Sequence, residues 1–116
     1  MLKSIFLALL LSVSALAHDI SGKWEFTVQL DAGSGTPSFV FKQVGENLTG
    51  TYIGLLGTAE LTGTLKGDAI EFSFEVSVED QKGKVVYKGM VTSDKQMKGD
   101  VDYPGLGKGS WTATKK

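Results

Sequence analysis

The chain has 116 residues, a formal net charge of −1 and no cysteine. Its twelve basic residues are all Lys and are balanced by thirteen Asp and Glu residues. This balance argues against binding to nucleic acid, which needs a basic surface that displaces counterions. Without cysteine, the fold must be held by packing and hydrogen bonds rather than by disulfides.

Residues 1–17 have the three parts of a secretory signal peptide. Met1-Leu2-Lys3 is a short positive start, Ser4 to Ala17 is almost wholly apolar, and Ala15-Leu16-Ala17 is a small-x-small cleavage site. The apolar stretch is too short to favour a membrane-spanning helix of about 20 residues, and the alternative is an uncleaved N-terminal anchor. We therefore expect cleavage after Ala17, a secreted or periplasmic protein, and a single domain over residues 18–116 with no membrane span.

Almost all of the sequence after His18 alternates between apolar and polar residues with period two, which is typical of half-buried strands. We expect strands over residues 24–30, 39–44, 48–54, 61–65, 69–80, 85–92, 97–103 and 109–116. The clearest strand is 69–80, in which alternate residues from Ile70 to Val78 are bulky and apolar. Segments 31–37 and 80–83 are rich in Gly, Pro and polar residues, so we expect turns there.

The spacing of these strands predicts an all-β fold. Short loops favour antiparallel neighbours, and no connection is long enough for a Greek-key crossover. We expect an antiparallel up-and-down barrel of about eight strands, because closure removes exposed sheet edges. The alternative is a sandwich of two sheets.

Five glycines lie within predicted strands and share the parity of their apolar neighbours: Gly50, Gly63, Gly89, Gly99 and Gly109. Two of them belong to a phrase that occurs twice, LTGTYIG at 48–54 and LTGTLKG at 61–67. An inward glycine weakens a strand unless the strand bends or a neighbour approaches closely. We interpret these glycines as sites of bending, and the repeat as two neighbouring strands with the same curvature. Aromatic packing is expected to fill the interior, with a modest cavity as the alternative.

Catalytic and metal-binding patterns are poorly represented. The only histidine, His18, would be the first mature residue, and we expect it to be solvated and to bind no metal. No Ser lies in a G-x-S-x-G elbow, and the pairs Glu71 with Glu75 and Asp100 with Asp102 have outward parity. We therefore expect a protein that is not an enzyme and has no cofactor.

Aromatic residues of inward parity are the candidate ligand-binding residues: Trp24, Tyr52, Tyr103 and Trp111. Tyr52 and Tyr103 lie near predicted strand ends, where a phenol could reach the mouth of a barrel. A short apolar run at a predicted turn supplies the candidate partner-binding residues Ile53, Leu55 and Leu56.

Several phrases resemble a known group: GKW (22–24), FVFKQVGENLTGTY (39–52), the second LTG and the closing GSWTAT. Over nearly all of residues 20–114 the chain resembles small secreted bacterial β-barrel domains of lipocalin-like, or calycin-like, architecture. These domains have no assigned function and occur alone or appended to hydrolases. The resemblance implies a barrel.

A weaker resemblance is to the avidin and streptavidin family. Tyr52 matches that family's ligand-facing tyrosine. Phe26 and Leu30, however, stand where the family has polar biotin contacts, and Gly54 stands where it has a hydroxyl. The similarity therefore implies the fold and argues against biotin as the ligand.

These observations predict a secreted or periplasmic, non-enzymatic binding module. It would hold a small apolar ligand in the barrel or a protein partner on its surface. The alternative is an accessory or inhibitory domain that acts on a hydrolase, and a small hydrolytic enzyme is the third hypothesis.

Overall fold

The computed structural model describes residues 18–78 and 80–116, and over these residues the chain forms one antiparallel sheet of nine strands. The strands are β1 (Gly22–Leu30), β2 (Gly33–Gly35), β3 (Ser38–Val44), β4 (Asn47–Gly54), β5 (Gly57–Lys66), β6 (Ala69–Val78), β7 (Gln81–Ser93), β8 (Gln96–Tyr103) and β9 (Gly107–Lys115). The all-β prediction is confirmed. In the described part of the chain, no helix is long and apolar enough to cross a membrane.

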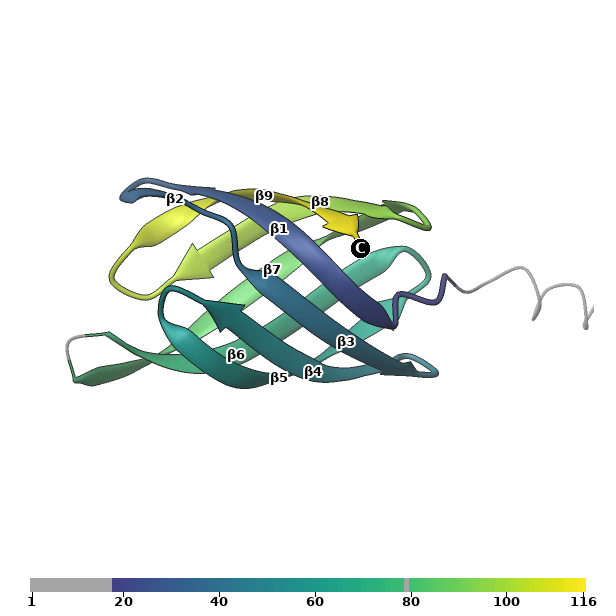
Figure 1. Ribbon diagram of the computed structural model, residues 1–116, viewed down its shortest axis with the longest axis horizontal. Coiled ribbons are helices and arrows are strands. Elements are labelled where there is room, and N and C mark those ends of the chain that lie inside the picture. Colours follow the sequence, from purple (N-terminus) through teal and green to yellow (C-terminus); the bar gives the residue numbers. More distant parts are fainter. Residues whose placement is uncertain (1–17, 79) are drawn as a thin grey trace, which may run out of the picture.

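The sheet closes on itself into a barrel (Figure 1). From β3 to β9 each strand pairs with the next along the chain, and β1 pairs with both β3 and β9. The β1–β9 register runs from Trp24 opposite Lys115 to Leu30 opposite Gly109. The predicted up-and-down barrel of about eight strands is therefore confirmed, with β2 as a short additional strand.

The prediction of a turn over 31–37 is wrong in part. The turn is confined to Asp31 and Ala32, and β2 follows it, with Gly35 opposite Val28 of β1. Thr36 and Pro37 then separate β2 from β3, while the Phe26 N–H donates to the Pro37 carbonyl oxygen at 2.9 Å. Because β1 continues past the end of β3, it offers a hydrogen-bonding edge that draws this glycine-rich segment into the sheet.

The predicted turn at 80–83 is also shorter in the structure. Val76 pairs with Gly83 and Val78 pairs with Gln81, so Gln81–Gly83 belong to β7. Asp80 adopts a left-handed φ of 66°, a conformation that Asp tolerates better than most residues. Figure 1 shows this hairpin reaching past the neighbouring strands. We predicted that the Val78 side chain points inward, but this side chain is not among those that the structure describes.

Aromatic side chains pack together in the middle of the barrel. The Phe26 ring lies 4.4 Å from Phe39 and 4.8 Å from Trp111, between ring centroids. The Phe72 and Tyr87 rings stack at 4.8 Å. Tilted and offset pairs of this kind add to the free energy of burial. The expected aromatic filling of the interior is therefore observed.

The interior glycines mark places where neighbouring strands approach closely. At each of the five, a Cβ would overlap a backbone carbonyl oxygen of the adjacent strand: Val40 for Gly50, Glu71 for Gly63, Lys98 for Gly89, Lys88 for Gly99 and Gln29 for Gly109. The repeated phrase lies on β4 and β5, where Leu48 is opposite Gly63 and Leu61 is opposite Gly50. The glycine of each copy therefore lies directly opposite the leucine of the other copy.

Residues 18–21 cross one end of the barrel and close it. The Ile20 side chain is fully buried, and the Ile20 carbonyl accepts a hydrogen bond from the Trp24 indole at 2.9 Å. Gln43 fixes the segment: its amide oxygen accepts from the Ile20 N–H at 2.9 Å, and its amide nitrogen donates to the His18 carbonyl at 3.0 Å. The opposite end of the barrel is where the candidate site lies.

Candidate ligand cavity at the barrel mouth

A cavity of about 640 Å³ lies at the end of the barrel opposite to Ile20. Three parts of the chain line it. They are the end of β1 with β2 and Pro37 (Thr27–Leu30 and Ala32–Pro37), the end of β4 with its turn (Tyr52 and Gly54–Leu56), and the β8–β9 turn (Tyr103 and Leu106).

Small residues keep this mouth open. Gly35 pairs with the inward-facing Val28, so a side chain at Gly35 would point into the cavity, and a Cβ there would meet nothing within 4 Å. At Gly54 a Cβ would overlap the Tyr52 hydroxyl. Gly35 therefore leaves open space at the mouth, and Gly54 makes room for the Tyr52 side chain.

Two tyrosines form the floor of the cavity. The exposed fractions of Tyr52 and Tyr103 are only 2% and 5%, yet both line the cavity. The Tyr103 hydroxyl lies 2.6 Å from the Tyr87 hydroxyl, and the Tyr52 ring stacks on Phe74 with centroids 4.4 Å apart. The Leu56 N–H donates to the Tyr52 oxygen at 3.4 Å, a long hydrogen bond. Packing and hydrogen bonds thus fix where these hydroxyls point.

The floor is polar but uncharged. Burial raises the pKa of both Tyr87 and Tyr103 above the ordinary value of a phenol. Both hydroxyls therefore stay protonated through neutral and mildly alkaline pH. None of the described residues that line the cavity carries a charged side chain. The site offers apolar surface and neutral hydroxyl groups.

The structure brings together only some of the candidate ligand-binding residues. Tyr52 and Tyr103, from β4 and β8, meet at the cavity. Trp24 and Trp111 are not among the described residues that line it. Trp24 lies under Ile20 at the closed end, and Trp111 packs against Phe26 in the core.

The candidate partner-binding residues separate in the structure. Leu56 is half-buried against the core, whereas Leu55 is 92% exposed at the rim, and both line the cavity. Ile53 is 45% exposed on β4 and is not one of the described lining residues. The apolar run is therefore shared between the cavity and the outer surface.

Sequence reasoning did not identify the lining residues from β1, β2 and Leu106. One signal for these residues was present in the sequence. Gly35 has the same parity as Pro37 and Phe39, which indicates that it faces inward. Because the segment was interpreted as a loop, no face could be assigned to it.

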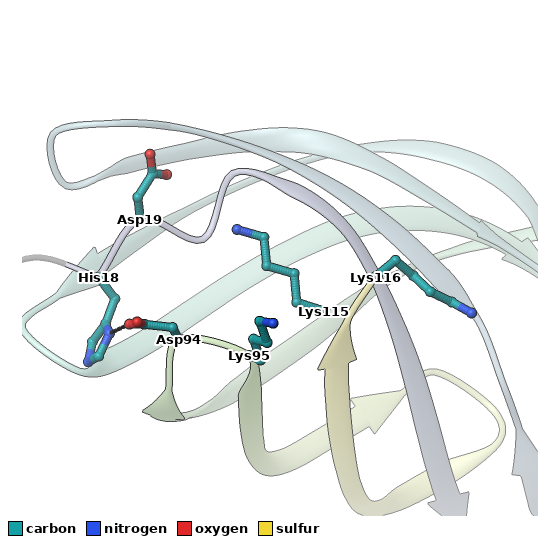
Figure 2. A pocket seen from close by; sticks show the side chains of 6 residues that line it. All are labelled: His18, Asp19, Asp94, Lys95, Lys115 and Lys116. Atoms are coloured by element: carbon teal, nitrogen blue, oxygen red, sulfur yellow. Dashed lines mark hydrogen bonds and ion pairs between the residues drawn. The ribbon is translucent and has the colours of Figure 1, made fainter.

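A second hollow, of about 510 Å³, lies beside the closed end and is lined by His18, Asp19, Asp94, Lys95, Lys115 and Lys116 (Figure 2). Figure 2 shows the His18 ring directed at Asp94, with Nδ1 2.9 Å from a carboxylate oxygen. Its Nε2 lies 3.2 Å from Asp68. His18 thus contacts two aspartates, although we expected it to be solvated. The hollow is lined by charges of both signs and offers little apolar surface.

Within residues 18–78 and 80–116, no group of three or more His, Cys, Asp or Glu side chains is placed to hold a metal ion.

The comparisons with known proteins indicate the fold. No family model matches the chain, and no curated protein matches it either. The chain is similar to a redesigned beta barrel, b11L5F_LGL, with 18% identity and a TM-score of 0.68 over 84% of this chain and 91% of that one. It is also similar to a redesigned beta barrel, mFAP1, bound to DFHBI, with 14% identity and a TM-score of 0.58 over 84% of this chain and 94% of that one. These likenesses show a small antiparallel β-barrel.

Proposed function

We propose that this protein is a non-enzymatic binding protein that holds a small, mainly apolar ligand in the cavity at the barrel mouth. The observation that carries the proposal is the cavity of about 640 Å³ above two buried tyrosines. This volume lies in the range of about 300–1,000 Å³ that is usual for ligand pockets. The barrel mFAP1, which is bound to DFHBI, supports the idea that a barrel of this shape accommodates a small molecule.

The proposal includes export from the cytoplasm to the periplasm or the medium. The signal-peptide pattern of residues 1–17, which lie outside the described residues, supports it. The resemblance to secreted lipocalin-like barrels supports it too. The uncharged, largely apolar lining of the cavity favours binding over catalysis, since no charged acid or base faces it among the described residues.

Nile red, a neutral dye whose fluorescence rises in apolar surroundings, tests the cavity directly. The purified protein should bind it, and Gly35→Leu, which places a side chain in the mouth, should weaken binding by about tenfold or more. Ser110→Leu is the matched control, because Ser110 is an exposed residue of β9 and is not among the described residues that line the cavity. Equal binding by wild type and Gly35→Leu, or no binding by a folded wild type, would overturn the proposal.

A second candidate function is the binding of a protein partner, such as a hydrolase, through the rim. The 92% exposure of Leu55 favours it, because an apolar side chain at a turn tip gains by being covered. Native mass spectrometry of protein purified from its own compartment separates the candidates. A co-purified small molecule supports the cavity, whereas a stoichiometric protein lost in Leu55→Asp supports the partner.

A further inference from the structure

We infer that the mouth cavity selects uncharged ligands that carry a hydrogen-bond acceptor, such as a ketone oxygen, and that the Tyr52–Tyr103 hydroxyl pair donates to this acceptor. The inference rests on the proposed function and specifies the chemistry of the ligand. It depends on the direction of the hydrogen bond between Tyr87 and Tyr103.

The Tyr87 hydroxyl sets that direction. Tyr87 is fully buried, and among the described residues its hydroxyl has a single hydrogen-bond partner, the Tyr103 hydroxyl at 2.6 Å. If Tyr103 donated to Tyr87, the Tyr87 proton would be a buried donor without an acceptor, which is costly. Tyr87 therefore donates to Tyr103.

The proton of Tyr103 must then point away from Tyr87. Tyr103 lines the cavity together with Tyr52. The Tyr52 oxygen already accepts from the Leu56 N–H. Among the described residues, neither the Tyr103 proton nor the Tyr52 proton has an acceptor. Both protons are therefore free to be donated to a group in the cavity.

The cavity offers no partner for a charged ligand. The described lining residues include neither Lys nor Asp nor Glu, and burial raises the pKa of Tyr103, which keeps its hydroxyl neutral. A ligand carboxylate or ammonium would lose hydration without gaining an opposite charge. Neutral ligands with an acceptor should therefore bind better than their charged analogues.

Three tricyclic probes that share one ring skeleton test this selectivity: xanthone has a ketone, xanthene has a methylene in its place, and xanthene-9-carboxylate is an anion. Their affinities are measured by displacement of Nile red from the wild-type protein. Since a net hydrogen bond corresponds to roughly fivefold in affinity, xanthone should bind about fivefold tighter than xanthene. The carboxylate should bind most weakly.

Variants identify the donor. In the double variant Tyr52→Phe/Tyr103→Phe the xanthone-to-xanthene affinity ratio should fall to about one, whereas in Tyr87→Phe it should stay within about twofold of wild type. The ratio compares two probes on the same protein, so a general loss of stability cancels. Should the double variant fail to fold, Tyr52→Phe, which leaves the Tyr87–Tyr103 pair intact, should still lower the ratio.

The outcomes separate this inference from the proposed function. If the wild type binds Nile red but binds xanthone and xanthene equally, or binds the carboxylate most tightly, the inference is wrong and the proposed function stands. An unchanged ratio in the double variant likewise overturns the assignment of the donor. If the folded protein binds no neutral probe, both are wrong.

Discussion

At Gly63 the backbone of β5 runs so close to β6 that a Cβ would overlap the carbonyl oxygen of Glu71. Gly35, by contrast, lies in β2 with open space at its Cβ position and no left-handed φ. The same residue type thus permits close packing of strands at one place and leaves a cavity at another.

We predict opposite effects of alanine at these two glycines. Gly63→Ala should lower the free energy of unfolding by about 1–3 kcal/mol, because the added methyl group forces the strands apart. Gly35→Ala should be neutral or stabilising by up to about 1 kcal/mol, because it restricts the unfolded chain without a clash. Urea denaturation measures both values, and equal effects would contradict the close approach at Gly63.

The buried tyrosines predict how stability depends on pH. Burial raises the pKa of Tyr87 in the folded state, so the folded protein retains a proton that the unfolded chain releases above about pH 10. The contribution to stability is complete below this pH and is lost as the pH rises from there toward the raised pKa of the folded state. Tyr87→Phe should therefore flatten the alkaline decline of the free energy of unfolding.

The measurement is a series of denaturation curves between pH 8 and pH 11.5. The difference between variant and wild type at pH 8 reports the loss of the Tyr87–Tyr103 hydrogen bond, and the slope above about pH 10 reports the titration. An identical slope in the variant and the wild type would assign the alkaline decline to other groups.

The sequence could predict which way the tyrosines and tryptophans point, but not how deep they lie. Period-two parity places Tyr52, Tyr103, Trp24 and Trp111 inside the barrel, and all four are buried. Parity carries no information about position along the barrel axis, which is set by strand register and stagger. Only the nearness of Tyr52 and Tyr103 to strand ends pointed to the mouth.

Among the elements, β2 and the β6–β7 hairpin show a sheet overriding local turn preferences. Gly33, Ser34 and Gly35 have low β propensity, yet they pair with the end of β1. Gln81–Gly83 likewise extend β7 beside β6. In both places a neighbouring strand offers free backbone hydrogen-bonding groups along its edge. The β propensity of the local residues does not account for this edge, so the sequence alone does not predict the extra strand residues.

The segment at 18–21 was missed because it has no strand pattern of its own. The signal lay elsewhere: Gln43 continues the inward parity of Phe39 and Phe41, which is unusual for a polar residue. An inward glutamine at a strand end needs backbone partners, and His18 and Ile20 provide them.

We predict that Gln43→Ala releases this segment. The change removes hydrogen bonds to the His18 carbonyl and the Ile20 N–H, and should lower the free energy of unfolding by about 1–2 kcal/mol. Amide hydrogen exchange should accelerate over residues 18–24 and stay unchanged in β6 and β7. Val44→Ala is the control, since Val44 is 63% exposed. Equal exchange in the two variants would show that Gln43 does not hold the segment.

For the whole molecule, the decisive contact is the seam between β1 and β9, which joins the two ends of the sheet. The two strands are the first and last long strands in the described residues, so this pairing closes the largest loop in the chain. Closure lets both edges of the sheet satisfy their backbone hydrogen bonds, and it does so in a chain without disulfides.

An engineered disulfide across the seam tests closure in solution. Thr27 of β1 and Thr112 of β9 are exposed cross-strand partners, and opposed antiparallel residues lie within about 4.5–5.5 Å, a separation that a disulfide spans. Thr27→Cys/Thr112→Cys should therefore oxidise readily to an intrachain disulfide, detected by mass spectrometry. The oxidised form should gain up to about 4 kcal/mol in free energy of unfolding, because the bond constrains a long unfolded loop.

A second pair provides the control. In Thr27→Cys/Glu71→Cys the second cysteine lies on β6, which is not a neighbour of β1 in the sheet, so the intrachain bond should not form in the folded protein. If the two pairs oxidise to the same extent, the β1–β9 seam is open in solution. The cavity would then lie at the edge of an open sheet. The selectivity for neutral ligands, which depends on the tyrosine floor of a closed barrel, would not be expected.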